Sequence, residues 1–272
     1  MIKQSKDNRK AWNTISESYQ KRYSIKTDKL YWGPLCDSKE TDRLLGKIEG
    51  KKILELGSGA GQNSIYLAKK GANTIAFDIS EEQLRYGKSI AKKESVPVTF
   101  VQGNYESVKK HFEPNSFDLV ISAFALQYCM TVDSLNDVMK QIYELLKPNG
   151  VLIFSVDHPI RDHGYWNSVD NFIIDNYFDR GNKAWKYEFP EDNIAARMTG
   201  SYKTVSDYLM SVINANLVLN NVLEPEPITK ETSNNFATKS RYIDNLKANP
   251  FTYKHLKRIP GTLIIKASKK KI

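Results

Sequence analysis

The stretch ILELGSGAGQNSIYLA, residues 53–68, joins an expected buried strand to an expected helix through a turn that holds three glycines. Gly57, Gly59 and Gly61 are costly to order, because glycine loses more backbone freedom on folding than any other residue. A glycine-rich turn between a strand and a helix N-terminus lets backbone amides approach a ligand closely. The stretch therefore predicts either a ligand-binding loop or a tight turn.

Around this loop, short apolar runs alternate with helical segments from Lys51 to Gly150. The apolar runs ILEL, LVIS and VLIF lack in/out alternation, as expected of strands that are covered on both faces. Strands are expected at 51–57, 73–80, 98–104, 117–124, 151–159, 217–225 and 261–269, and helices at 63–72, 80–96, 134–147 and 204–216. The alternation predicts a doubly wound, mostly parallel, seven-stranded α/β sheet of the Rossmann-like type.

The chain outside this alternation divides the molecule into four expected parts. Residues 1–50 contain one or two amphipathic helices, whose aromatics either pack on the sheet or form a lid over a ligand. Residues 51–158 form the ligand-binding half of the α/β domain, and residues 205–272 complete it, with an exposed helical or irregular segment near 230–258. Residues 159–204 are rich in aromatics, and 172–179 and 184–190 are expected to be strands of a small antiparallel insertion.

The amino-acid composition limits the classes of protein to which this chain can belong. The 272 residues include 40 Lys and Arg against 31 Asp and Glu, a formal charge of +9. Much of this excess lies near the ends of the chain, without an arginine-rich run among aromatics, so nucleic acid is an unlikely partner. No secretory signal is visible, and the most apolar stretch, 119–130, is too short to span a bilayer. Cys36 and Cys129 match no metal or redox spacing, so we expect no metal and a cytoplasmic protein.

Two residues near the loop indicate which ligand it holds. Asp78 closes the second expected strand 21 positions after Gly57, where a carboxylate can accept both hydroxyls of a ribose. A dinucleotide fingerprint needs a third glycine at the position that Gln62 occupies. A nucleoside ligand is therefore favoured, and a nicotinamide-dependent oxidoreductase is disfavoured.

The motifs ELGSGAG at 55–61, FDIS at 77–80 and LKPNGVLIFS at 146–155 together resemble those of class I S-adenosylmethionine-dependent methyltransferases. More narrowly, the chain is similar to the small-molecule branch known as type 11 methyltransferases. The resemblance implies S-adenosyl-L-methionine as cofactor, S-adenosylhomocysteine as product, and methyl transfer to a small-molecule acceptor by in-line displacement. It also implies that residues 159–204 form a cap that binds the acceptor.

The resemblance further implies roles for individual residues. The glycines at 57, 59 and 61 should line the methionine and ribose portions, Asp78 should hold the ribose hydroxyls and Ile79 should pack on the adenine. Others should contact the adenine edge, the amino-acid end or the sulfonium, namely Asn104, Tyr105, Ala123, Phe124, Glu55 and the lid residues Tyr19 and Tyr23. Glu55 has an alternative role as a strand-end carboxylate bonded to loop amides. Gln127 stands near a place where the family often has a histidine, which leaves its role open.

Catalysis of methyl transfer needs a base only if the acceptor loses a proton early. His158, which follows the fifth expected strand, is the first candidate for a base or acceptor contact, and His163 and Asp157 are weaker ones. The alternative is that His158 caps the strand and shapes the turn.

Two other functions stay open, an RNA or protein methyltransferase and a non-catalytic nucleoside-binding module. SAFALQ at 122–127 lacks the Asn/Asp-Pro-Pro-aromatic motif of enzymes that methylate base amino groups. The oligomeric state is expected to be a monomer or homodimer.

Overall fold

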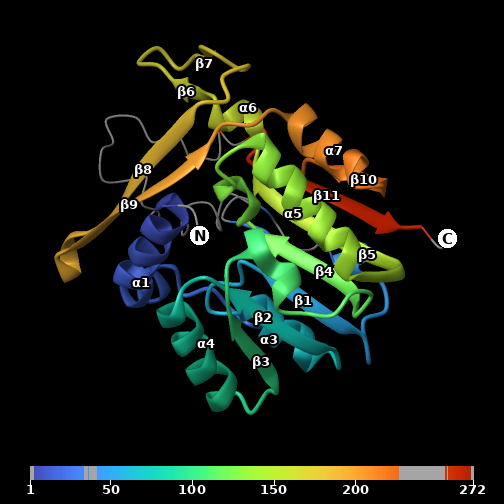
Figure 1. The fold of residues 1–272 in the computed structure, drawn as a ribbon. Coiled ribbons are helices and arrows are strands. Elements are labelled where there is room, and N and C mark those ends of the chain that lie inside the picture. Colours follow the sequence, from blue (N-terminus) through green and yellow to red (C-terminus); the bar gives the residue numbers. More distant parts are fainter. Residues whose placement is uncertain (1–2, 34–35, 37–41, 227–254, 256, 271–272) are drawn as a thin grey trace.

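The computed structural model describes residues 3–33, 36, 42–226, 255 and 257–270 (Figure 1). The segment near 230–258, expected to be helical or irregular, lies outside these residues except for 255, 257 and 258.

A seven-stranded sheet forms the centre of the molecule. Its strands are β1 (Lys52–Leu56), β2 (Asn73–Asp78), β3 (Val98–Gln102), β4 (Phe117–Ala123), β5 (Leu146–Asp157), β10 (Leu217–Leu223) and β11 (Thr262–Lys269). They are ordered β10-β11-β5-β4-β1-β2-β3, and only β11 runs antiparallel to its neighbours. This confirms the predicted fold class. The strand order reverses between β1 and β4, which is where open α/β sheets bind ligands.

Both faces of the sheet are covered, which explains the missing alternation in the apolar runs. The helices are α3 (Gln62–Lys69), α4 (Glu81–Lys93), η1 (Tyr105–Lys110), α5 (Val132–Leu145) and α7 (Val205–Asn214). In β1, Leu54 and Leu56 join the core beneath η1, α5 and α7, whereas Ile53 joins the core beneath α3. Helix α4 begins after Ser80, whose hydroxyl accepts from Gln83 N at 3.2 Å, as an N-cap does.

Helix α5 ends two residues earlier than predicted. It was expected to reach Lys147, but it stops at Leu145, and β5 begins at Leu146 rather than near Val151. Lys147 precedes Pro148, and the proline ring disfavours the helical conformation of the residue before it. The helix must therefore end before this pair.

The insertion after β5 is antiparallel, as predicted, but contains more strands than were predicted. A short helix α6 (Pro159–Asp162) leads into one hairpin, β6 (Gly164–Trp166) with β7 (Phe172–Ile174), and a second hairpin follows, β8 (Asn182–Phe189) with β9 (Ile194–Ser201). The predicted strands at 172–179 and 184–190 correspond to β7 and β8, and each pairs with a neighbouring strand that was not predicted, β6 or β9. Short connections allow such antiparallel hairpins. The strand at 172 also ends at Ile174 rather than 179.

The N-terminal helix α1 (Lys3–Tyr23) lies between α4 and the β8–β9 hairpin (Figure 1). A second short helix, α2 (Asp42–Leu45), precedes the sheet. Asn8 joins α1 to β9, since its side chain donates to Thr199 O at 2.8 Å and accepts from Thr199 N at 2.9 Å. Within the part of the chain described, none of the helices has the length and apolar character that a bilayer-spanning segment needs.

Candidate functional site

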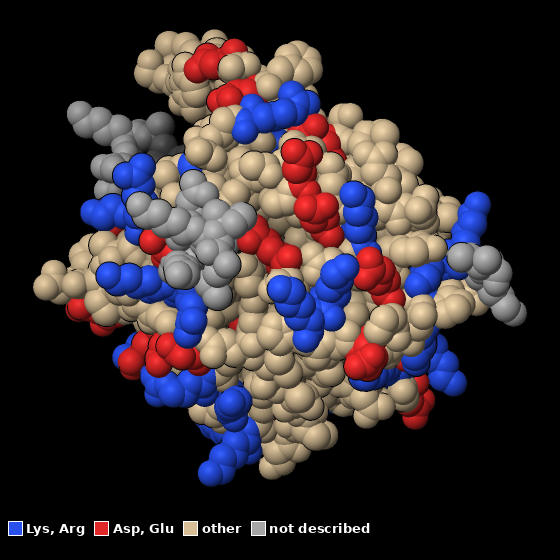
Figure 2. Space-filling model, in the orientation of Figure 1, with Lys and Arg blue, Asp and Glu red and all other residues tan. Residues whose placement is uncertain are grey.

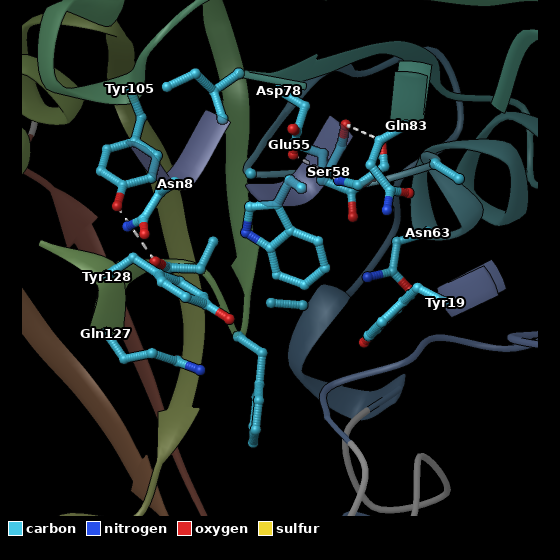
Figure 3. A pocket seen from close by; sticks show the side chains of 18 of the residues that line it. Asn8, Tyr19, Glu55, Ser58, Asn63, Asp78, Gln83, Tyr105, Gln127 and Tyr128 are labelled. Carbon is cyan, nitrogen blue, oxygen red and sulfur yellow. Dashed lines mark hydrogen bonds between the residues drawn. The ribbon is translucent and has the colours of Figure 1, made fainter. Parts of the chain in front are cut away.

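A pocket opens at the carboxyl ends of β1 to β5, over the point where the strand order reverses (Figure 3). Loops from all five strands line it, and α1 and the β8–β9 hairpin supply the opposite wall. Most of the residues predicted for the cofactor line this pocket: Tyr19, Tyr23, Glu55, Gly57, Gly59, Asp78, Ile79, Asn104, Tyr105, Ala123 and Phe124. Gly61 and His158 do not.

Gly57 and Gly59 have different reasons to be glycine. Both have left-handed backbones, with φ of 66° and 56°. A Cβ at Gly57 would lie 2.2 Å from the Cβ of Ala125, so the loop can pack against β4 only without a side chain there. A Cβ at Gly59 would find nothing closer than Gln83 Oε1 at 3.9 Å. Gly59 thus keeps open a space that belongs to the pocket.

Gly61 lies behind the loop rather than in the pocket, contrary to its expected contact with the ligand. It has φ of 71° at the N-cap of α3, and a Cβ there would meet Phe100 and Ala76 at 3.1 and 3.2 Å. Gly87 on α4 serves the same packing, since its Cβ would lie 2.2 Å from Ala60 O. No sequence pattern indicated this role of Gly87, because it lies inside a helix that follows the next strand of the chain.

Asp78 ends β2 at the floor of the pocket and is 9% exposed. One carboxylate oxygen accepts from Gly59 N at 2.8 Å and the other from Ser80 N at 2.8 Å. Burial raises the pKa of Asp78 to about 6, and the two backbone amides oppose this rise. The carboxylate therefore braces the glycine loop and keeps further lone pairs for a ligand.

Glu55 holds the start of α3. Its Oε2 accepts from Ser64 N at 2.9 Å and from Ser64 Oγ at 2.6 Å. Burial raises the pKa of Glu55 to about 7. The structure thus shows the strand-end carboxylate that sequence reasoning offered as the alternative, although Glu55 also borders the pocket.

Asn104 and Tyr105 form the wall after β3. The Asn104 side chain accepts from Glu106 N at 3.0 Å, as the N-cap of η1, and donates to Glu106 Oε2 at 3.1 Å. Tyr105 is oriented by its hydroxyl, which donates to Ala125 O at 3.4 Å, and burial raises its pKa well above the usual value. Both residues border the pocket where an adenine was expected.

Phe124 follows β4 in a left-handed conformation, with φ of 55°. Its ring lies against Gly33, where a Cβ would come within 2.1 Å of it. The segment that carries Gly33 is fixed in turn by Asn63, whose side chain donates to Tyr31 O at 3.0 Å and accepts from Tyr31 N at 2.7 Å. The segment with Gly33, which lies 24 residues before Gly57 in the chain, therefore shapes the pocket wall.

A chain of three glutamine side chains closes the pocket from α1. Gln62 donates to Gln20 Oε1 at 2.6 Å, and Gln20 donates to Gln83 Oε1 at 2.7 Å. All three are buried. Gln62, which the sequence used only to exclude a dinucleotide, thus links the glycine loop to the N-terminal helix. No local pattern could reveal this link, because the partners are 42 and 63 residues apart.

Aromatic rings join α1 to the β8–β9 hairpin above the pocket. Trp12 lies 5.2 Å from Tyr19, 6.0 Å from Tyr128 and 5.5 Å from Tyr187, measured between ring centroids. Tyr23 packs on Tyr19 at 4.5 Å. These rings are both a small core of their own and the inner surface of the pocket.

His158 is placed away from the pocket and does not suit the role of a base. It is fully buried, its Nδ1 accepts from Ile160 N at 3.2 Å, and its Nε2 lies 2.7 Å from Glu224 Oε1. Burial lowers its pKa, although the neighbouring Glu224 opposes this effect. Its role is the turn-shaping one, as the N-cap of α6.

Of the two weaker base candidates, only one reaches the pocket. His163 has both ring nitrogens against carbonyl oxygens, of Pro159 at 2.7 Å and Asp179 at 3.2 Å, and it does not line the cavity. Asp157 does line it, beside Arg161, which sequence reasoning missed and which pairs with Asp157 at 3.0 Å. Among the described residues, no three His, Cys, Asp or Glu side chains gather as a metal site would require.

Comparison with known proteins indicates similarity to methyltransferases. A family model described as a methyltransferase domain matches residues 53–150. The Bacillus subtilis protein "Uncharacterized methyltransferase YbaJ" is 34% identical over 113 residues, 42% of this chain and 43% of its own length. The ubiquinone biosynthesis O-methyltransferase of Photorhabdus laumondii is 34% identical over 112 residues, 40% of this chain and 44% of its own length. The chain thus spans less than half the length of these two relatives.

Solved structures extend the likeness over most of the fold. The crystal structure of a presumed S-adenosylmethionine-dependent methyltransferase from Listeria monocytogenes superposes with a TM-score of 0.64 at 27% identity. The superposition covers 85% of this chain and 97% of that protein. The similarity therefore includes elements beyond residues 53–150.

Proposed function

Because this chain carries the domain of the class I S-adenosylmethionine-dependent methyltransferases, we propose that it is an enzyme that transfers a methyl group from this cofactor to a small-molecule acceptor. The observation that carries the proposal is the pocket itself. Gly59 leaves room beside the loop, Asp78 presents a buried carboxylate, and α1 covers both. A loop that served only as a tight turn would need no such space.

The residues present fit the cofactor. Asp78 would accept the ribose hydroxyls, and Ile79, Asn104 and Tyr105 would surround the adenine. The backbone after β4, at Ala123 and Phe124, would receive the ammonium of the amino-acid end. Gly57 contributes by letting the loop approach β4, and Gly61 by starting α3.

When bound, S-adenosylmethionine supplies a methyl group that its sulfonium makes electrophilic. The chain's own part is to hold the acceptor in line and to exclude water. The aromatic rings of α1 and the β8–β9 hairpin provide an apolar wall for this purpose. The described lining contains no histidine. The proposed mechanism therefore rests on alignment, and any proton is released to solvent or to Asp157.

A small acceptor suits the pocket better than RNA or a protein, because aromatic rings line it, among them Trp12, Tyr128 and Tyr187. Aromatic and apolar walls are typical of small-molecule sites. On the face shown in Figure 2, Lys and Arg side chains are interspersed with Asp and Glu and form no single basic surface. The relative from Photorhabdus laumondii is named as an O-methyltransferase of ubiquinone biosynthesis.

We also propose that the enzyme works in a reducing compartment such as the cytoplasm. Cys129 is a buried free thiol. Free thiols persist where glutathione and thioredoxin keep them reduced. The expectation of a monomer or homodimer stays a prediction.

Two measurements test the proposed function. Calorimetry should show S-adenosylhomocysteine binding, and incubation with methyl-labelled S-adenosylmethionine and a cell extract should put label into the small-molecule fraction. The extract is then separated into small molecules, RNA and protein. No heat of binding from a folded sample would refute the assignment of the cofactor. Label confined to RNA or protein would refute the small acceptor, and binding without transfer to any fraction would favour a non-catalytic module.

The affinity for S-adenosylhomocysteine should depend on pH through Asp78. The unliganded carboxyl has a pKa of about 6, and ribose hydroxyls donate best to its ionised form. Binding should therefore strengthen by about tenfold as pH rises from 5 to 7 and then level off. Calorimetry across this range measures the change. The Asp78→Asn variant should lose the pH step, and a step that persists in it would assign the dependence to another group such as Glu55.

A further inference from the structure

Lys203 is a buried lysine that the proposed mechanism does not use. It follows β9, directly before Thr204, the N-cap of α7, and only 1% of its surface is exposed. A buried ammonium group is costly unless hydrogen-bond acceptors replace the water that it loses on folding. The position of Lys203 inside the protein therefore needs an explanation.

The acceptors of Lys203 include main-chain oxygens of the turn that follows β4. This turn contains the short helix η2 (Leu126–Tyr128). Lys203 Nζ donates to Cys129 O at 2.6 Å and to Gln127 O at 3.5 Å. It also donates to the Oγ and O atoms of Ser201, at 2.9 and 3.3 Å, at the end of β9. The ammonium therefore joins the turn after β4 to the β8–β9 hairpin.

The turn after β4 is held from two sides. On the cofactor side, the Tyr105 hydroxyl donates to Ala125 O at 3.4 Å. On the hairpin side, β9 packs directly against the turn, since a Cβ at Gly200 would lie 3.1 Å from Gln127 O. The hydrogen bonds of Lys203 are on this second side. The position of the turn therefore depends on the hairpin as well as on the cofactor half of the domain.

This turn borders the part of the pocket that is left to the acceptor. Asp78 and Asn104, which are assigned to the ribose and the adenine, stand at the ends of β2 and β3, on one side of β1. Strands β4 and β5 lie on the other side of β1. In Figure 3, Gln127 and Tyr128 lie across the cavity from Asp78. The wall that the turn forms therefore faces away from the nucleoside site.

The turn supplies part of the aromatic and apolar lining. Tyr128 and Met130 both line the pocket. The Tyr128 ring lies 6.0 Å from Trp12 and 5.2 Å from Trp185, measured between ring centroids. Such side chains are typical of the walls of small-molecule sites. A shift of the turn would displace this wall relative to an acceptor that must be held in line.

Building on the proposed function, we propose that Lys203 is a positioning residue for the acceptor, because its ammonium holds the turn that places Tyr128 in the acceptor part of the pocket. Lys203 neither contacts the acceptor nor takes a proton from it. Among the described residues, none of its hydrogen bonds reaches the glycine loop or Asp78. Loss of the ammonium should therefore weaken the use of the acceptor and leave cofactor binding unchanged.

The positioning role should depend on pH, because it requires the charge of Lys203. Burial lowers the pKa of Lys203 to about 8. The groups that surround it are Cys129 in the turn, Lys183 on β8, Asp162 on α6 and Asp207 on α7. Burial raises the pKa of the Cys129 thiol to about 12, so this thiol stays protonated at pH 9. Between pH 7 and 9, Lys203 should lose the charge that attracts the carbonyl oxygens of the turn.

Methyl transfer at varied acceptor concentration tests the proposal. Methyl-labelled S-adenosylmethionine is incubated with the enzyme and with a dilution series of the small-molecule fraction of a cell extract. The Lys203→Met variant keeps an unbranched side chain but loses the charge and the donors. Its transfer rate at low concentrations of the fraction should fall about 10- to 100-fold, the range of a small misplacement in an aligned reaction. The KM for S-adenosylmethionine and the affinity for S-adenosylhomocysteine should stay within twofold of wild type.

Lys269→Met is the matched control variant. Lys269 is also buried, and its Nζ donates to Asn115 Oδ1 at 2.8 Å, to Tyr143 O at 2.9 Å and to Leu146 O at 2.8 Å. Leu146 begins β5, so this lysine lies at the edge of the sheet opposite the pocket. The control variant should keep both transfer and S-adenosylhomocysteine affinity within twofold of wild type. An equal loss of transfer in the two variants would contradict a specific role of Lys203.

The pH profile of the wild-type enzyme tests the same role without any variant. The transfer rate at low concentrations of the fraction should fall as pH rises from 7 to 9, with a midpoint near 8, where Lys203 loses its proton. The Lys203→Met variant should lack this fall. A wild-type profile without the fall, or a fall that persists in the variant, would overturn the proposal.

The remaining outcomes separate this proposal from the function on which it rests. If S-adenosylhomocysteine does not bind, or no label enters the small-molecule fraction, the proposed function fails and this proposal fails with it. If wild-type enzyme transfers label and Lys203→Met transfers it equally well, the role of Lys203 is wrong while the proposed function stands. The same conclusion follows if the variant loses S-adenosylhomocysteine affinity more than twofold.

Discussion

Replacing Asp78 with asparagine is expected to weaken S-adenosylhomocysteine binding by at least about 100-fold. Hydrogen bonds to a charged group contribute about 1.5–3 kcal/mol each, and the variant loses the charge that both ribose hydroxyls would meet. The asparagine also has only one acceptor oxygen for the amides of Gly59 and Ser80, which now share the carboxylate at 2.8 Å each. Calorimetry measures the loss.

The stability of the unliganded Asp78→Asn variant should change little, by about 1–2 kcal/mol in either direction. Losing one amide acceptor is destabilising, but removing a buried charge is stabilising, and the two effects oppose each other. The raised pKa shows that the ionised carboxylate is unfavourable in the empty pocket. Above the folded pKa of about 6, this group lowers the stability of the native state, and below the unfolded value it does not.

Asp118→Asn is the matched control for this prediction. Asp118 also accepts from a backbone amide, Lys52 N at 2.8 Å, and pairs with Lys147, but it stands at the opposite end of the sheet from the pocket. This variant should leave S-adenosylhomocysteine affinity unchanged within twofold. Equal losses in the two variants would mean that the effect at Asp78 comes from general destabilisation, and would contradict its role in binding.

Replacing Gly57 with alanine is expected to lower the free energy of unfolding by about 2–5 kcal/mol. The left-handed backbone costs a side chain about 1–2 kcal/mol, and forcing an extra methyl into a packed site adds about 1–3 kcal/mol. The clash is with the Cβ of Ala125 at 2.2 Å, an atom that cannot rotate away. Urea unfolding with linear extrapolation measures the change.

Gly59→Ala provides the comparison for Gly57→Ala. Its backbone strain is similar, but the new Cβ meets only Gln83 Oε1, at 3.9 Å. Stability should therefore fall by only about 1–2 kcal/mol, whereas S-adenosylhomocysteine affinity should fall more than tenfold because the methyl enters the pocket. If Gly59→Ala bound the ligand normally, the open space at this position would not belong to the cofactor.

Much of the site was predictable because it depends on local order in the chain. A strand, a glycine turn and a helix N-terminus are adjacent in sequence, so the position of the loop at the edge of the sheet could be predicted. The same spacing did not distinguish Gly57 and Gly59, which line the pocket, from Gly61, which does not. Asp78 followed from its position at the end of the next strand, since parallel strands end at the same edge of the sheet. These positions depend only on the strand–helix period.

The assignments that failed depend on contacts across the fold. His158 stands at the correct edge of the sheet, but the packing of Glu224 from β10's end turns it away from the pocket and buries it. Gly61 was expected beside the ligand, yet the start of α3 places it against Phe100. The position of a residue along a strand predicts at which edge of the sheet the residue lies. Packing against neighbouring residues decides in which direction its side chain points.

The sequence by itself determined the α/β alternation, the glycine loop and the carboxylate that serves it, because each depends on residues within about one strand–helix unit. Only the tertiary structure decided how helix α1 is joined to the glycine loop. The glutamine chain through Gln20 joins residues 42 and 63 positions apart. Which polar groups are hydrogen-bonded to one another depends on how distant segments pack together. A local pattern of residues therefore cannot predict it.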